Sequence, residues 1–160
     1  MSNLVPISIT GFNKLKEELN RLEIEAMEVR KRVSEAREQG DLSENGEFIY
    51  GRQQLGFLDG RLGELRAKIN HSEKIDCTKV QTERAVFGTI VTLLNLQTKE
   101  KVTYQLLGPN DADIDNGSIS IHSPVGDAIH GLSVGDKTVV KSPRGEIHFE
   151  VIDIAKSQIA

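Results

Sequence analysis

The sequence is poor in the residues from which several common classes of protein are built. Of its 160 residues, one is cysteine, none is tryptophan, and only 4% are aromatic. A single thiol, Cys77, cannot form an internal disulfide, which is typical of a protein from a reducing compartment. We expect it to be a small, half-buried hydrophobic residue. The apolar fraction of 38% also argues against one large compact core.

Long apolar runs and an excess of basic residues are missing as well. No segment approaches the roughly 20 apolar residues that cross a bilayer, and residues 1–10 lack the features of a signal peptide. The net charge is −4, whereas a protein that wraps bare nucleic acid normally carries a large positive charge. We therefore expect a soluble cytoplasmic protein without membrane contact, whose contact with nucleic acid is local or is arranged by a partner.

The first half of the chain carries a sustained heptad pattern. Apolar or small residues recur at alternating steps of three and four, which predicts the seam of a coiled coil. The first series is Phe12, Leu15, Leu19, Leu22, Ala26, Val29, Val33 and Ala36, and the second is Phe48, Gly51, Leu55, Leu58, Leu62, Leu65 and Ile69. Gly51 leaves a thin position, and Thr10 is a candidate N-cap. Because the connection is very short, the two helices must run antiparallel.

From Val86 onward, short β-rich runs separated by turn residues replace the helical pattern. They predict strands at 86–94, 101–107, 118–121, 137–141 and 146–154. Pro124 predicts a short helix at about 125–130, because proline suits the first helical turn. The sequence thus predicts an α+β protein with an antiparallel coiled-coil domain at 1–76 and a second domain at 77–160.

The acidic connection between the two helices, residues 40–47, admits two interpretations. Gly40 can end the first helix, and Asp41 and Glu44 have the spacing of a capping box for the second. The same carboxylates can instead supply part of a Mg²⁺ site, because this hard cation takes oxygen ligands and often uses only one or two carboxylates. Two acids on a thin tip cannot hold the ion alone, so a partner would supply the remaining ligands.

Basic residues flank this tip on a chain that is acidic overall: Arg30, Lys31, Arg32, Arg37 and Arg52. They are either ordinary solvated helix charges or a patch that guides RNA phosphates towards the tip. We favour Arg37 and Arg52 as the RNA-binding residues, because their positions mirror each other across the hairpin near its end.

Several separated segments resemble the Gre family of bacterial transcript-cleavage factors, in particular its GreA type. The tip segment at 36–45 reads AREQGDLSEN, and 53–57 and 60–61 match on the second helix. In the second half, the resemblance rests on 87–96, 118–124 and 139–146. It therefore spans essentially the whole chain.

The resemblance implies a coiled-coil hairpin followed by an FKBP-like α+β domain that docks on bacterial RNA polymerase. In this family the coiled coil enters the secondary channel, where the tip acids, here Asp41 and Glu44, help the polymerase active site to hold Mg²⁺. The polymerase then cleaves backtracked RNA near its 3′ end. The chain would be a catalytic cofactor rather than an enzyme, with no metal bound on its own. His122, Ser123 and Pro124 fall where the family contacts polymerase, although an ordinary loop into a helix is the alternative.

Four positions depart from the family pattern: Met27, Gly46, Phe48 and Asp127, where Pro, Ala, Tyr and Arg are usual. Asp127 lies beside the expected docking loop and so bears on docking, whereas the tip acids are intact. A secondary-channel inhibitor that does not stimulate cleavage is the main alternative function. A prolyl isomerase would need an aromatic pocket that the sequence hardly provides, and a structural adaptor would not need an acidic tip.

Overall fold

The computed structural model describes residues 3–38 and 46–160. The chain forms two compact units, Asn13–His71 and a C-terminal unit that combines Met1–Phe12 with Ser72–Ala160. These units differ from the predicted ranges 1–76 and 77–160, because two short strands that the sequence did not predict pair with each other. Strand β1 (Val5–Ser8) pairs in parallel with β2 (Ser72–Ile75). Both strands therefore belong to the C-terminal unit.

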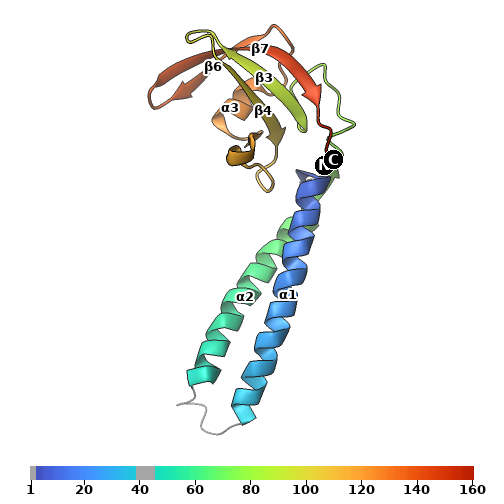
Figure 1. Ribbon diagram of the computed structural model, residues 1–160, viewed down its shortest axis with the longest axis vertical. Helices are drawn as coiled ribbons and strands as arrows, with labels where there is room; N and C mark the ends of the chain where they lie inside the picture. The colour runs from blue at the N-terminus through green and yellow to red at the C-terminus, as the bar shows by residue number, and fades with distance from the viewer. Residues whose placement is uncertain (1–2, 39–45) are drawn as a thin grey trace. The chain divides into compact units, whose positions relative to one another are not determined.

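The unit Asn13–His71 is the predicted antiparallel helical hairpin. Helix α1 (Ile9–Glu38) enters it and α2 (Gly46–Asn70) returns alongside (Figure 1). The buried residues follow the heptad pattern: Leu15, Leu22, Ala26, Val29 and Ala36 on α1, with Gly51, Leu58, Leu62 and Leu65 on α2. The remaining seam residues are half-buried. The prediction of a coiled-coil seam is therefore confirmed.

The predicted N-cap of the first helix was wrong by two residues. Helix α1 starts at Ile9, and the hydroxyl of Ser8 accepts a hydrogen bond from the Gly11 N–H at 3.0 Å. The Thr10 hydroxyl instead donates to the carbonyl of Ala160, the last residue of the chain. Ser8 and Thr10 can both cap a helix, but the Thr10 hydroxyl is engaged with Ala160, and Ser8 serves as the cap.

The C-terminal unit is built on a five-stranded mixed sheet in the order β5-β4-β3-β7-β6. Its strands are β3 (Thr89–Asn95), β4 (Lys101–Leu107), β5 (Ser118–Ser120), β6 (Lys137–Ser142) and β7 (Gly145–Lys156). All neighbours run antiparallel except β4 and β5. A 3₁₀ turn, η1 (Ile114–Asn116), precedes β5, and helix α3 (Pro124–Ile129) follows it. The five predicted strands and the short helix are confirmed with small shifts at their ends.

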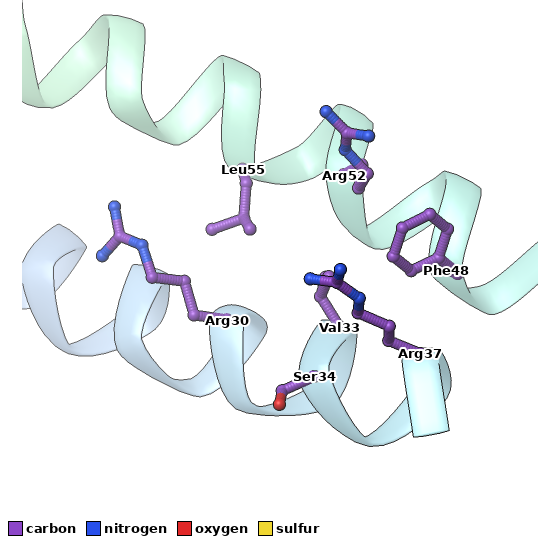
Figure 2. Close-up of a pocket in the computed structure, with 7 residues that line it drawn as sticks. All are labelled: Arg30, Val33, Ser34, Arg37, Phe48, Arg52 and Leu55. Atoms are coloured by element: carbon purple, nitrogen blue, oxygen red, sulfur yellow. The ribbon is translucent and has the colours of Figure 1, made fainter. Parts of the chain in front are cut away.

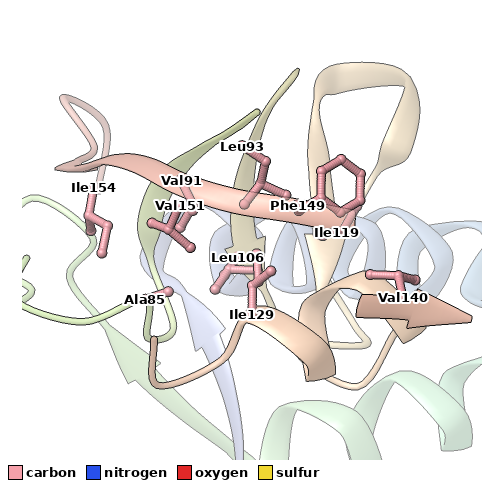
Figure 3. Close-up of a cluster of buried hydrophobic side chains, with 10 residues drawn as sticks. All are labelled: Ala85, Val91, Leu93, Leu106, Ile119, Ile129, Val140, Phe149, Val151 and Ile154. Carbon is pink, nitrogen blue, oxygen red and sulfur yellow. The ribbon is translucent and has the colours of Figure 1, made fainter. Parts of the chain in front are cut away.

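The core of this unit lies between the sheet and α3 (Figure 3). Alternate residues of β3 and β7 point to one face, where Val91 and Leu93 meet Phe149 and Val151, and α3 covers them with Ile129. A period of two is what a half-buried strand requires.

A smaller cluster holds Cys77 with Phe87 and Leu107, so the thiol packs as a hydrophobic residue but is fully buried, whereas the sequence predicted a half-buried one. Burial, followed by the nearby carboxylates of Asp111 and Asp76, raises the pKa of this thiol to about 11. Across the described residues, the structure has no helix that is both long and apolar enough to span a membrane.

Candidate functional site

Ion pairs across the helical hairpin define its register. On one flank, Arg66 Nη2 lies 3.2 Å from Glu23 Oε1, and Arg30 Nη2 lies 2.6 Å from Asp59 Oδ1. The two pairs are seven residues apart on each helix, forward along α1 and backward along α2. One further heptad in the same direction brings Arg37 of α1 to the position opposite Arg52 of α2. The series of opposite charges therefore ends in a pair of like charges.

The other flank of the hairpin shows no such conflict. Arg61 Nη2 lies 2.8 Å from Glu18 Oε1, and Arg61 Nη1 lies 3.2 Å from Glu64 Oε2. The hydrogen bond to Glu18, followed by the one to Glu64, raises the pKa of Arg61. Heptad steps from this pair bring Glu25 level with Gln54, and then Arg32 level with Glu47. Only the Arg37 and Arg52 position, among the described positions of these two series, places two cations against each other.

A pocket of about 540 Å³ lies at this position, lined by Arg30, Val33, Ser34, Arg37, Phe48, Arg52 and Leu55 (Figure 2). Arg30 is engaged with Asp59. Arg52 lies over the ring of Phe48, with the guanidinium carbon 5.8 Å from the ring centroid. In the part of the chain that the structure describes, neither Arg37 nor Arg52 has a carboxylate partner. The pocket is therefore cationic, with an aromatic ring and two aliphatic side chains in its wall.

At the level of this pocket, the Val33 side chain of α1 lies beside Gly51 of α2. A Cβ atom at Gly51 would lie 2.6 Å from Val33 Cγ2, which is too short for any real contact. The predicted thin position in the seam is thus filled by Val33 from the opposite helix. Glycine at 51 therefore leaves room for the Val33 side chain, which lines the pocket.

This arrangement suits a phosphate chain. Two guanidinium groups at an exposed seam repel each other unless an anion lies between them. Guanidinium binds phosphate through two parallel hydrogen bonds, and such charge-assisted bonds are stronger than neutral ones. The pocket can therefore hold a phosphate of a polyanion more readily than it can hold a neutral ligand.

Comparisons with known proteins bear on both halves of the chain. The family description "Transcription elongation factor, N-terminal" matches residues 5–73, and "Transcription elongation factor, GreA/GreB, C-term" matches residues 80–156. The transcription elongation factor GreA of Desulfotalea psychrophila is 44% identical over 161 residues, covering 100% of each chain. That of Thermodesulfovibrio yellowstonii is 40% identical, covering 97% of this chain and 99% of the relative. That of Pasteurella multocida is 38% identical, covering 94% and 96%.

The chain belongs to the GreA/GreB family of transcription elongation factors. The resemblance that the sequence motifs suggested is thereby confirmed over both halves. Arg37, in the last turn of α1, and Arg52, near the start of α2, flank the tip segment of this GreA/GreB hairpin in sequence. The tip acids Asp41 and Glu44 lie outside the described residues, so the capping and the metal-binding interpretations both stay predictions.

The three predicted docking residues of this family member lie between β5 and α3. The Ser123 hydroxyl accepts from the Gly126 N–H at 3.1 Å and donates to the Ser120 carbonyl at 2.6 Å, so it caps α3. Pro124 occupies the first turn of that helix. Helix capping thus accounts for Ser123 and Pro124 locally. His122 is exposed, and its backbone N–H donates to Ser120 Oγ at 3.1 Å, while no side-chain contact within residues 3–38 and 46–160 gives its imidazole a similar local role. Docking by these residues stays a prediction.

Proposed function

We propose that this chain binds bacterial RNA polymerase in the cytoplasm and stimulates cleavage of the 3′ end of backtracked RNA, which releases arrested complexes. Its helical hairpin enters the secondary channel of the polymerase. The C-terminal unit docks outside through the loop that contains His122, Ser123 and Pro124. The observation that carries the proposal is the like-charged pair of Arg37 and Arg52. It ends a series of opposite charges, and its two residues flank the acidic tip segment in the sequence of a member of the GreA/GreB family.

Each group of residues has a distinct task in this mechanism. Arg37 and Arg52 hold the phosphates of the extruded RNA, so that its backbone passes the end of the hairpin. Asp41 and Glu44 offer carboxylate oxygens, the ligand type that Mg²⁺ prefers, to an ion shared with the polymerase active site. When bound, this ion activates water and stabilises charge on the cleaved phosphate. The chemistry belongs to the polymerase, and this chain is its catalytic cofactor.

Conservative tip variants separate the metal-binding role from helix capping. Asparagine caps a helix about as well as aspartate, so Asp41→Asn keeps the cap but removes the charge. We expect Asp41→Asn and Glu44→Gln to abolish stimulated cleavage of stalled, backtracked complexes, as measured by sizing the RNA. The concentration needed to occupy the polymerase should be unchanged. Glu35→Gln, at an exposed acid on α1, is the matched control and should behave like the wild type.

Two outcomes would overturn the proposal or part of it. Full stimulation by Asp41→Asn at saturating concentration would show that the tip acids do not serve the metal. Binding of the wild-type chain that slows elongation without shortening the RNA would instead identify a secondary-channel inhibitor.

A further inference from the structure

The cationic pocket of the hairpin also has an apolar part, which a phosphate would not use. Three of its lining residues are Val33, Phe48 and Leu55, and we call them the pocket floor. All three belong to the heptad seam, yet each is only half-buried. The alternate seam residues at this level, Ala36 and Gly51, are buried. The seam is therefore partly open at the pocket and leaves apolar surface there in contact with water.

Side chains of both helices meet at this floor. Phe48 and Leu55 project from α2, and the Arg37 guanidinium projects from α1, towards the space between the two helices (Figure 2). The guanidinium carbon of Arg52 lies 5.8 Å from the centroid of the Phe48 ring, within the range of a cation over an aromatic face. This contact indicates that a planar group can lie over the ring.

The mixture of apolar and cationic side chains fits a nucleotide better than it fits a free anion. Small-molecule sites of about 300–1,000 Å³ are typically lined by apolar and aromatic side chains with a few polar groups, and this pocket measures about 540 Å³. A nucleotide combines a flat base with an anionic phosphate. Proteins stack the bases of single-stranded RNA on aromatic rings and on guanidinium planes. Such a nucleotide would use the floor and the arginines together, whereas a free phosphate would leave the floor in water.

We propose that this pocket binds one nucleotide of single-stranded RNA, with its base on the Phe48 ring and its phosphate on Arg37 and Arg52. Phe48 is thus a base-stacking residue in addition to the two phosphate-binding arginines. The proposal rests on the proposed function for the source of the RNA, which is the extruded 3′ segment. Stacking tolerates every base, because each base has an aromatic face. This tolerance suits an elongation factor, which meets transcripts of any sequence.

The first test measures binding of the full-length chain to a short single-stranded RNA that carries the fluorescent base 2-aminopurine, whose emission falls when it stacks. At low salt, Phe48→Leu should bind about 5- to 10-fold more weakly than wild type and quench less, because an aliphatic side chain offers no ring. Phe48→Tyr keeps the ring and should match wild type. The matched control is Phe57→Leu on the same helix, which should also match because Phe57 is 78% exposed and lies outside the pocket.

The salt dependence of binding separates base contacts from phosphate contacts. For a single strand, the logarithm of the binding constant falls with the logarithm of the salt concentration by about 0.7 for each phosphate that is neutralised. Phe48→Leu should lower the affinity without changing this slope. Arg37→Gln should instead make the slope shallower by about 0.7. A slope that changes in Phe48→Leu as it does in Arg37→Gln would show that the ring only positions the arginines, and would overturn its stacking role.

The second test changes the RNA and leaves the protein untouched, so a folding defect cannot imitate its result. Abasic RNA of the same length keeps the phosphates but has no bases to stack. Wild type should bind it about 5- to 10-fold more weakly than ordinary RNA, whereas Phe48→Leu should bind both alike. Equal binding of the two RNAs by wild type would overturn the proposal. The same preference in Phe48→Leu as in wild type, or no quenching by wild type at low salt, would also overturn it.

The proposed function and the nucleotide pocket can fail separately. If wild type stimulates no RNA cleavage in backtracked complexes, yet prefers ordinary to abasic RNA through Phe48, the proposed function fails and the nucleotide pocket stands. If wild type stimulates cleavage but binds the two RNAs alike, the nucleotide pocket fails and the proposed function stands.

Discussion

The Arg37 and Arg52 position can be tested against the ion pair one heptad away by double-mutant cycles. Each cycle replaces both members of a pair by alanine, singly and together, in the full chain. One cycle covers Arg37 with Arg52, and the other covers Arg30 with Asp59, whose charged atoms lie 2.6 Å apart. The coupling free energy from each cycle reports whether the two side chains attract or repel one another.

The expected magnitudes follow from exposure. The side chains of Arg30 and Asp59 are both 54% exposed, so their coupling should be favourable by only about 0.2–1 kcal/mol. Like charges at equivalent positions should be unfavourable by a similar amount, about 0.2–1 kcal/mol. The cycle cancels effects that belong to one residue alone. These are the stacking of Arg52 on Phe48, the favourable place of Arg37 near the end of α1, and helix propensity.

Urea unfolding and amide exchange in α1 and α2 measure both couplings at low and high salt. The screening length falls from about 30 Å at 0.01 M to about 3 Å at 1 M salt, so both couplings should shrink towards zero. A short RNA at low salt should also reduce the repulsion between Arg37 and Arg52. A favourable or absent coupling at this pair, beside a favourable one at Arg30 and Asp59, would refute the register from which the site is inferred.

Three other predictions follow from the same structure. Arg37→Ala combined with Arg52→Ala should weaken cleavage of long backtracked RNA more than cleavage of dinucleotide overhangs, and the difference should shrink with salt; equal losses would indicate a general defect of the tip. In thermal melting, Gly60→Ala should stabilise the hairpin by up to about 1 kcal/mol, because a Cβ there meets nothing within 4 Å. Gly51→Ala should instead destabilise the hairpin, because its Cβ would clash with Val33. The reverse order of stability would contradict the packing of the seam. Burial raises the pKa of Cys77 from 9.0 to about 11. The free energy of unfolding should therefore be unaffected by this thiol below pH 9 and should fall as the pH rises towards 11, because the unfolded chain loses the thiol proton first. Cys77→Ala should remove this pH-dependent loss.

Heptad spacing predicted the hairpin because it is a local property of each helix. Alternation predicted the five strands of the sheet for the same reason. The sequence did not predict β1 and β2, whose strands are only four residues long and whose partners, such as Val5 and Ser72, are far apart in the chain. The sequence also did not predict that Ser8 rather than Thr10 caps the helix, because the contact that engages Thr10 comes from Ala160, 150 residues away.

The candidate site was predictable in part. Mirror symmetry of the two heptad series brought Arg37 and Arg52 to the same level, and the structure places both in one pocket. Arg37 and Arg52 differ from the neighbouring pairs, which carry opposite charges. Those ion pairs depend on the register of the two helices, and heptad spacing does not determine that register to within one residue.

The charges on the hairpin are not arranged for stability alone. A glutamate at position 37 would continue the pattern of Glu23 with Arg66, and alanine would suit the open positions Gly56, Gly60 and Gly63 better than glycine does. The described part of the hairpin instead has its ion pairs towards one end and the two cations Arg37 and Arg52 towards the other. Any anion that binds only the folded hairpin stabilises it by mass action. A phosphate chain between Arg37 and Arg52 would therefore stabilise the folded hairpin at the end where these two arginines lie.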